Sequence, residues 1–394
     1  MKKITYSILL FLILASTNSC VEEFNAATVE FEDAIIIEAT ITNEFKHQKI
    51  LLSRTHKFEE DGPSAETSAT VLIISNSNTT YTFSETEPGV YTSDIQFSAL
   101  PSSNYQLSVA TSNGREYLSE FVGLTSSSST IENIYAIRET NEDGVDGIAI
   151  YVDSFDPTSS SKYYGYEYEE TYQIVAPFWM PDEFLIVPAT DTSPINLTIT
   201  PRTQEERECY TTLSSFGKEL TDTNLLSEDR VEKFLVKFFP VDDIRINSRY
   251  SILIKQYTQS VESYNYLEIL NNLSGSESLF SQNQPGFLAG NITSTNNPNE
   301  KVLGYFEASS VTEERFFVDR SEIFDSSDFF DWPICEITSL PVSELLRLVR
   351  TDKVSFYEEV PPVPTEPLSF RVVPSSCGDC TKLGSNIKPN FWID

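Results

Sequence analysis

Apolar and polar residues alternate over short stretches in the first third of the chain, a pattern typical of β-strands with one buried face. The stretches are rich in Val, Ile, Tyr, Phe and Thr, and turn-forming Gly, Pro, Asn and Asp separate them. They cover residues 35–42, 49–55, 69–75, 80–85, 89–97, 105–111 and 116–124. Strands at this close spacing predict an immunoglobulin-like β-sandwich over residues 31–124. The Cys–Trp–Cys core of antibody-type domains is missing.

A serine-rich joint at residues 125–130 precedes longer alternating runs, which predict a second, larger β-rich domain over residues 131–394. These runs cover residues 131–139, 146–155, 161–175, 231–241, 248–258, 300–311 and 315–323. The fold is therefore expected to be mainly β, with an N-terminal sandwich followed by a larger β-rich domain of α+β type.

One or two helices are expected within the second domain. Residues 260–273 carry apolar side chains at near-helical spacing, and Ser260 is suited to cap the start of a helix. A shorter helix is predicted over residues 342–352, after a proline. The stretches near 176–230 and 274–299 show neither period and are expected to be loops.

The N-terminus has the pattern of an export signal. Two lysines precede a short apolar run at residues 8–14, well below the roughly 20 residues needed to span a bilayer. The small residue before Cys20 resembles the lipobox of bacterial lipoproteins, although Thr17 stands where leucine is usual. We predict a lipoprotein signal peptide over residues 1–19 and lipidation of Cys20. An ordinary signal peptide with an incidental cysteine is the alternative.

Acidic residues directly after this cysteine extend the prediction to the cell surface. Glu22 and Glu23 resemble the short acidic signal that sends lipoproteins of the Bacteroidota to the outer face of the outer membrane. We therefore expect residues 20–30 to form an acidic tether. The protein is expected in the outer membrane, held by its lipid anchor and facing the cell exterior. The alternative is a flexible tether without any signal function.

The charge balance excludes one class of partner. The chain has 27 Lys and Arg against 59 Asp and Glu, a net charge of −32. Such a surface repels phosphate backbones, so we expect no nucleic-acid partner. Solubility in an extracellular medium explains the acidity, and a calcium-binding surface is the alternative.

No recognisable catalytic constellation is present. His47 and His56 are the only histidines, too few for a three-histidine metal site, and both lie in the first predicted domain. Residues 215–218 match the pattern S-x-x-K, but its companion motifs are missing. A glycosidase needs two carboxylates about 5–9.5 Å apart, and no sequence pattern identifies such a pair among so many acids. We therefore expect no catalytic residue, metal site or cofactor.

Cysteines after the predicted anchor are even in number, which in an exported chain predicts disulfides. The candidates are Cys209, Cys335, Cys377 and Cys380, and three pairings are possible. Residues 377–380 also form a C-x-x-C motif, so a redox site and a metal site are the alternatives.

Two aromatic segments are candidates for binding. The first places three tyrosines on one strand face, either packed inward or exposed as a binding platform: Tyr164, Tyr166 and Tyr168. The second lies between two prolines and is either a partner-binding patch or a plug over the core: Phe178, Trp179 and Met180.

Several longer segments carry a resemblance to a known family. They are "IIIEATITNE", "ILLSRT", "ATVLIIS", "GVYTSDIQF", "ECYTTLSS", "PGFLAGNI", "VLGYFEASSV" and the terminal "CGDCTKLGSNIKPNFW". Together they resemble the Bacteroidota lipoproteins grouped as domain of unknown function 4249, over nearly the whole chain after Cys20. That family has no assigned activity and offers no catalytic residues to transfer. Its recurrent cysteines match Cys209, Cys377 and Cys380, and also Cys335.

The resemblance also implies a role. Family members often lie beside TonB-dependent outer-membrane transporters, which implies an accessory function at the outer face of such a transporter. We therefore predict a non-enzymatic accessory or ligand-binding subunit. A glycan hydrolase using an unidentified carboxylate pair is the first alternative, and a surface adhesin is the second.

Overall fold

The structure is a computed structural model, and strands dominate it, so the prediction of a mainly β fold is confirmed. It describes residues 33–56, 62–125, 129–189, 196–274, 288–325, 334–361 and 368–393. The predicted signal peptide and tether, with Cys20, Glu22 and Glu23, lie outside the described residues, and these predictions stay predictions. No helix within the described ranges is long and apolar enough to cross a membrane.

The N-terminal strands form an antiparallel series that curls around its own core. In chain order they are β1 (Ile35–Thr42), β2 (Lys49–Arg54), β3 (Ser64–Ala65), β4 (Thr70–Ser75), β5 (Thr80–Glu87), β6 (Val90–Ser93), β7 (Asn104–Ala110), β8 (Glu116–Ser119) and β9 (Val122–Gly123). The main order is β1-β2-β6-β5-β4-β7-β8. Alternate side chains point inward, as the period of two predicts: Ile35, Ile37 and Ile41 of β1 are buried. An immunoglobulin-like topology for this part stays a prediction.

One long strand joins this core to the rest of the molecule. The first half of β20 (Val302–Asp319) pairs in parallel with β1, and its second half pairs antiparallel with β18 (Arg249–Thr258). Phe306 of β20 is buried in the N-terminal core, and β19 (Ile292–Ser294) pairs with β8. Residues of β19 and β20 therefore complete the N-terminal core. The predicted domain division had assigned these residues to the second domain only.

The sequence predicted two strands where β20 is one. Three consecutive polar residues, Thr312 to Glu314, interrupt the alternation and suggested a turn. In the structure these residues continue the ladder against β18, and the side chains of Glu313 and Glu314 are exposed. A solvated stretch inside a long strand gives the same local pattern as a turn, so this prediction was wrong.

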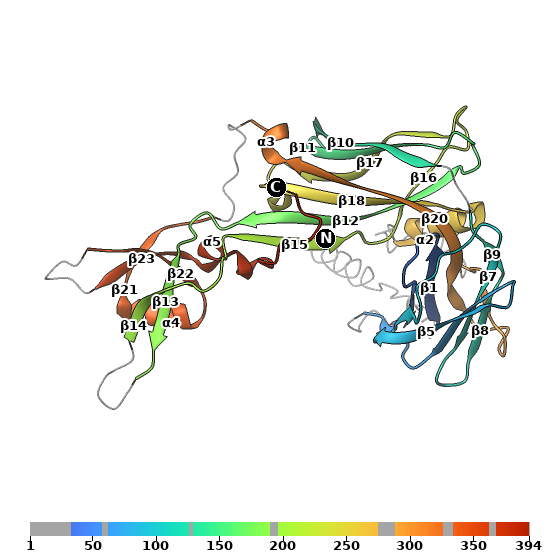
Figure 1. The fold of residues 1–394 in the computed structure, drawn as a ribbon, viewed down its shortest axis with the longest axis horizontal. Coiled ribbons are helices and arrows are strands. Elements are labelled where there is room, and N and C mark those ends of the chain that lie inside the picture. The colour runs from blue at the N-terminus through green and yellow to red at the C-terminus, as the bar shows by residue number, and fades with distance from the viewer. Residues whose placement is uncertain are drawn as a thin grey trace, which may run out of the picture.

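The central part is a second sandwich. One layer contains β18, β12 (Tyr163–Val175), β15 (Glu208–Ser214) and β16 (Glu219–Asp222). The other contains β10 (Thr130–Thr140), β11 (Asp146–Phe155) and β17 (Arg230–Pro240), and the layers stack as Figure 1 shows. Tyr164 and Tyr166 are buried between them, and Tyr168 is half-buried. The inward-packing alternative therefore holds for these tyrosines, and the exposed platform does not.

A small arm projects from the central part, at the left of Figure 1. It contains the hairpin β13 (Asp182–Val187) and β14 (Asn196–Pro201), the strands β21 (Thr338–Pro341), β22 (Val354–Glu359) and β23 (Ser369–Pro374), and the helices α4 (Val342–Arg350) and α5 (Ser375–Gly378). Its own core includes Leu345, Phe356 and Phe370. The loop prediction for 176–230 was wrong, because four short strands lie there. Most side chains of β13 are only half-buried, so the alternation that marks a strand is weak.

Two predicted helices are confirmed, α4 and α2 (Val261–Ser274). Ser260 caps α2 as expected, because its Oγ accepts the backbone N–H of Ser263 at 3.1 Å. Shorter helical turns are η1 (Ile244–Ile246), α3 (Arg320–Ile323) and η3 (Cys380–Lys382). Helix α2 lies where the N-terminal and central parts meet (Figure 1).

Candidate functional site: a pocket beneath helix α2

A pocket of about 330 Å³ lies between α2 and the outer face of strands β1 and β20. Its position follows from strand alternation. The odd-numbered residues of β1 between Ile35 and Ile41 point into the N-terminal core, so the even-numbered residues face the opposite side. On that side α2 lies over the strands but leaves Glu38 exposed, which creates an open cavity with a strand floor and a helical roof.

The floor changes from apolar to polar along the strands. Parallel register places Ile36 beside Leu303, then Glu38 beside Tyr305, then Thr40 beside Glu307. All six residues line the pocket. A ligand on this floor would meet hydrocarbon at one end and carboxylate at the other, which favours an amphipathic molecule.

The roof is one face of α2. Its lining residues recur at spacings of three and four, as one helical face requires: Ser263, Tyr266, Leu267, Leu270 and Asn271. The ring of Tyr266 packs against that of Tyr305, with centroids 5.5 Å apart. Asn271 Nδ2 donates to the backbone oxygen of Lys218 at 3.0 Å. These contacts connect the roof to the floor and to the turn between β15 and β16.

A buried ion pair closes the polar end. Lys218 Nζ lies 2.5 Å from Glu307 Oε1, the Glu307 side chain is buried, and that of Lys218 is 10% exposed. The hydroxyls of Ser263 and Thr40 also donate to this carboxylate, Thr40 at 3.2 Å. Burial alone would raise the pKa of Glu307, but Lys218 and the two hydroxyls outweigh it and lower that pKa. Glu307 is therefore ionised and fully engaged.

Gly165 makes room for this lysine. A methyl group at Gly165 would lie 3.2 Å from both Lys218 Cδ and the amide oxygen of Gln259. The ammonium of Lys218 also lies 4.3 Å from the ring centroid of Tyr257. The Ser215 hydroxyl accepts the Tyr168 backbone N–H at 3.1 Å, so this side chain helps to hold the turn at residues 215–218.

Two further carboxylates line the pocket without a cation. Glu167 of β12 accepts the Tyr257 hydroxyl at 2.8 Å. Within the described residues, no hydrogen bond or ion pair reaches the Glu38 carboxylate. Burial, and then the nearby charge of Glu167, raise the pKa of Glu38. The pocket thus carries an excess of negative charge.

A second hollow, of about 230 Å³, adjoins the first. Thr40, Glu167 and Lys218 line both. The remaining lining residues of the second come from β1, the segment between β1 and β2, β2 and β18: Thr42, Lys46, His47, Gln48, Lys49 and Tyr257. His47 Nδ1 lies 2.6 Å from the Ser93 backbone oxygen. The basic residues here share this hollow with Glu167, whereas Glu38 lines only the α2 pocket.

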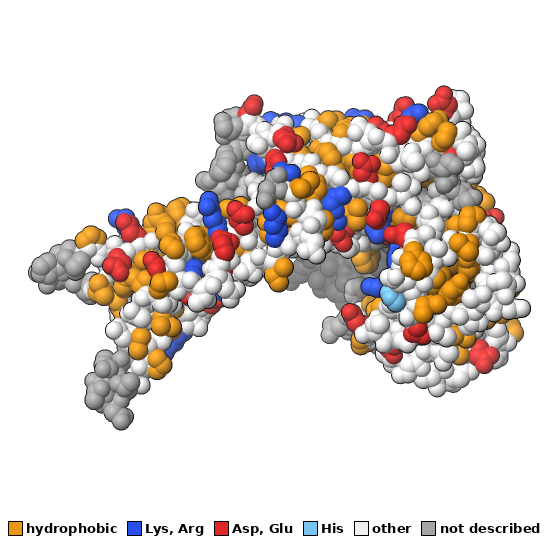
Figure 2. All heavy atoms as spheres, viewed as in Figure 1, with side chains coloured by type: hydrophobic (Ala, Val, Ile, Leu, Met, Phe, Trp, Pro, Cys, Tyr) orange, Lys and Arg blue, Asp and Glu red, His pale blue; other side chains and the backbone are white. Residues whose placement is uncertain are grey.

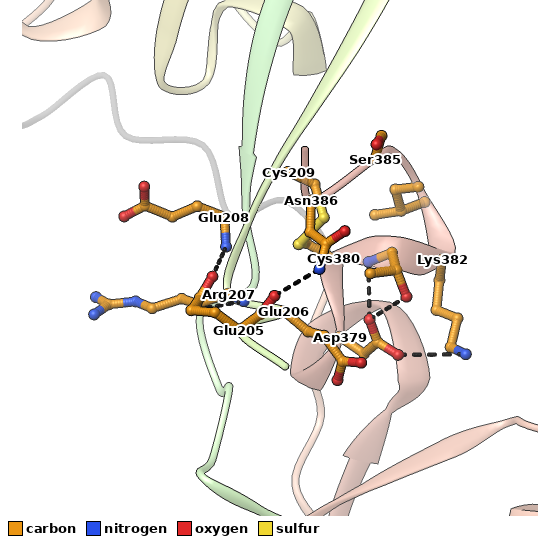
Figure 3. The surroundings of a disulfide bond; sticks show 12 residues. Glu205, Glu206, Arg207, Glu208, Cys209, Asp379, Cys380, Lys382, Ser385 and Asn386 are labelled. Carbon is orange, nitrogen blue, oxygen red and sulfur yellow. Dashed lines mark hydrogen bonds and ion pairs between the residues drawn. A yellow bond between two sulfur atoms is a disulfide. The ribbon is translucent and has the colours of Figure 1, made fainter. Parts of the chain in front are cut away.

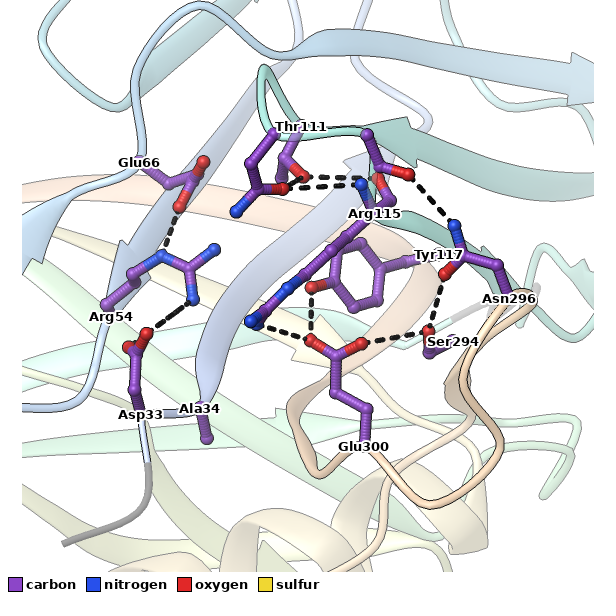
Figure 4. A network of polar contacts seen from close by, with 12 residues as sticks. Asp33, Ala34, Arg54, Glu66, Thr111, Arg115, Tyr117, Ser294, Asn296 and Glu300 are labelled. Carbon is purple, nitrogen blue, oxygen red and sulfur yellow. Dashed lines mark hydrogen bonds and ion pairs between the residues drawn. The ribbon is translucent and has the colours of Figure 1, made fainter.

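Another polar cluster is structural (Figure 4). Glu300, just before β20, accepts hydrogen bonds from Tyr117, Arg115 and Ser294 at 2.6, 2.9 and 3.0 Å. Burial and the Glu300 carboxylate raise the pKa of Tyr117 to about 12. These contacts fix β19 and β20 onto the N-terminal strands, and so help position the pocket floor.

The four cysteines form two disulfides, which confirms the prediction of disulfide bonds. The structure gives no support to the metal and redox alternatives. Cys209 of β15 bonds to Cys380 (Figure 3), and Cys335 bonds to Cys377. The C-x-x-C motif is therefore divided between two bridges. Together they attach the C-terminal segment to the central layer and to the arm.

The predicted partner-binding residues lie at the base of the arm. Phe178, Trp179 and Met180 are half-buried. Trp179 packs against the central core and Met180 against the arm core, while the Phe178 ring meets the Tyr357 ring edge-on at 5.4 Å. This placement fits the plug alternative. Their role in partner binding stays a prediction.

Comparison with known proteins gives a family. The model of a family described as a domain of unknown function (DUF4249) matches residues 21–315. This chain belongs to the DUF4249 family. No curated protein and no solved structure matches it. Every lining residue of the α2 pocket falls within the DUF4249 match, whereas β21, β22 and β23 follow it.

The sequence pattern alone does not predict this pocket. Its polar end joins residues from β1, the β15–β16 turn, α2 and β20, and only the three-dimensional fold brings these together. The spacing of the α2 face is the one local signal, since it leaves Ser263 and Asn271 on the same side as Leu267 and Leu270.

Proposed function

We propose that this protein is a lipid-anchored outer-membrane protein of the Bacteroidota, facing the cell exterior. In this proposal it binds a ligand beneath α2 as a non-enzymatic accessory subunit of a TonB-dependent transporter. The pocket is the observation that carries the proposal, because it is concave, amphipathic and held in shape by its own hydrogen bonds.

The chemistry of the pocket favours binding over catalysis. A general base needs a free lone pair within reach of the substrate, and Glu307 is engaged by Lys218 and two hydroxyls. Lys218 is neutralised in the same contact, so it does not serve as a nucleophile.

Sequence features support the location. The predicted lipid on Cys20 and the acids Glu22 and Glu23 support an anchor on the outer face of the outer membrane. The net charge of −32 suits an extracellular medium and argues against a nucleic-acid partner.

A glycan hydrolase is the second candidate, and one observation favours it. The pKa of Glu38 is raised and that of Glu307 is lowered within one pocket. Carboxylates whose pKa values are displaced in opposite directions are typical of acid and base pairs in glycosidases. The engagement of Glu307 makes this candidate weaker than the binding role.

The test blocks the pocket with a larger side chain and measures whether the transporter still co-purifies and whether uptake is lost. Leu267→Trp places a larger ring under α2, and Ile269→Trp makes the same change on the same helix outside the pocket. Each tagged variant is pulled from gently solubilised outer membranes, and its partners are quantified by mass spectrometry. Growth is compared on a medium where deletion of the gene gives an uptake defect.

We expect both variants to retain a stoichiometric β-barrel transporter. Growth should fall to the deletion level with Leu267→Trp and stay normal with Ile269→Trp. A protein purified without any transporter would overturn the accessory role. Equal growth of the two variants would show that the pocket is not the working site. Release of reducing sugar from glycans by the wild type, lost in Glu38→Gln, would favour the hydrolase.

A further inference from the structure

The charges that line the α2 pocket do not balance. Lys218 and Glu307 neutralise each other in a buried pair. Glu38 and Glu167 remain, and the described residues place no basic side chain in contact with either carboxylate. Other titratable groups in the lining are Tyr266 and Tyr305, which are neutral at pH 7, and burial raises the pKa of each still further.

Neighbouring basic residues are either paired with other acids or, like Lys49 and His47 of the adjoining hollow, make no ion pair with Glu167 within the described residues. Lys46 pairs with Glu44, and Lys255, which lies opposite Glu167 in the sheet, pairs with Glu313 at 3.3 Å. Glu38 is exposed to solvent and Glu167 is half-buried. Two neighbouring carboxylates repel each other, so they favour a bound cation that relieves the repulsion.

Beside these acids the pocket is apolar. Ile36 and Leu303 form the far end of the floor, and Leu267 and Leu270 face them from the roof. Tyr305 lies beside Glu38 in the β1–β20 register, and its ring packs against that of Tyr266, so aromatic faces, which attract cations, adjoin this carboxylate. A volume of about 330 Å³ is at the small end for ligand sites, so it suits a compact molecule.

We infer that the ligand of this pocket is an organic ammonium ion with a short apolar body. The ammonium lies between Glu38 and Glu167, and the hydrocarbon lies on Ile36, Leu303 and Leu267. This inference rests on the proposed function, since it names the class of ligand for the same pocket. A free amine and the lysine side chain of a peptide share this chemistry.

Isothermal titration of the detergent-solubilised full-length protein tests the inference, at pH 7.5 and low salt. The probes share one hydrocarbon length and differ in charge: hexylamine, hexanol and hexanoate. Hexylamine should bind one site, hexanol about tenfold or more weakly, and hexanoate not at all, since a charge-assisted hydrogen bond supplies the difference. A capped lysine as fourth probe separates the sources: binding as tight as hexylamine indicates a peptide, and weaker binding a free amine.

Variants assign the effect to the named acids. Glu38→Gln keeps the shape and should weaken hexylamine about tenfold while leaving hexanol unchanged. Glu167→Gln should act in the same direction. Glu87→Gln, on exposed β5, is the matched control and should bind like the wild type. Equal thermal midpoints for the Glu38 and Glu87 variants show that folding is intact.

Each contrary outcome has a separate meaning. Hexanol or hexanoate binding as tightly as hexylamine, and lost in Leu267→Trp, overturns the cation inference but leaves the pocket as a ligand site. No binding by any probe also overturns the inference, and the growth comparison then decides the proposed function independently. Amine binding that Glu38→Gln and Glu167→Gln leave unchanged overturns the assignment to these acids.

Discussion

A single buried ion pair holds the polar end of the α2 pocket together. Lys218 lies in a turn, Glu307 lies 89 residues later in β20, and Ser263 and Thr40 complete the contact. A buried pair of this kind adds little net stability when intact, because both charges are desolvated. Losing one partner is far more costly, since it leaves the other charge uncompensated.

The Lys218→Met variant should therefore lose about 3–5 kcal/mol of unfolding free energy at pH 7. Burial would then raise the pKa of Glu307 above its unfolded value, so the loss should shrink as the pH falls and the carboxylate becomes protonated. The wild type should behave oppositely and lose the stability from Glu307 as the pH drops below about 4.5. Urea denaturation across pH measures both trends. The double variant Lys218→Met/Glu307→Gln removes both charges and should recover most of the loss; no recovery would contradict this account.

No local pattern could have revealed these residues, whereas the cysteines were predictable. An even number of cysteines in a chain with a predicted export signal is typical of disulfides, so their oxidation could be expected without the fold. The importance of Glu38 or Glu307 comes only from neighbours that are distant in sequence. Among 59 acids, nothing local distinguishes them.

At the scale of elements, the parallel pairing of β1 and β20 builds the pocket floor. Most strand bounds followed from the alternation of side chains, and β1 has the predicted bounds 35–42. The pairing itself was not predictable, because a parallel neighbour can come from any distance along the chain. Gly304 marks the pairing: with φ of 142°, a methyl group there would lie 2.1 Å from the Ile37 backbone oxygen.

The Gly304→Ala variant should therefore disrupt the β1–β20 ladder. We expect a loss of about 3 kcal/mol or more, since both the backbone and its neighbour must move. Gly114→Ala is the matched control, with φ of 83° and no atom within 4 Å of the added methyl group, and should cost about 1 kcal/mol. Hydrogen exchange of the β1 amides, with chemical denaturation, measures both effects. Equal losses in the two variants would mean that the close approach is unimportant.

At the scale of the whole molecule, the pocket and the arm are separate structures in one chain. Figure 1 places α2 beside the N-terminal strands and the arm at the opposite end of the molecule, and Figure 2 shows acidic and basic side chains interspersed over the central surface between them. The disulfides lie on the arm side: Cys209–Cys380 bridges 171 residues and Cys335–Cys377 bridges 42. None of the four cysteines lines the α2 pocket.

The two bridges should thus affect stability without affecting binding. Loop-closure entropy assigns each roughly 3–5 kcal/mol, with the longer loop worth about 1 kcal/mol more. Cys209→Ala/Cys380→Ala should therefore destabilise the protein more than Cys335→Ala/Cys377→Ala, as measured by guanidinium denaturation. The buried position of Cys209 and Cys380 in the central core works in the same direction. Hexylamine affinity should equal that of the wild type in both double variants under conditions where they are folded. A weaker affinity in either one would show that the arm and the α2 pocket are coupled, and the reverse order of stability would mean that loop length does not govern the contribution of these bridges.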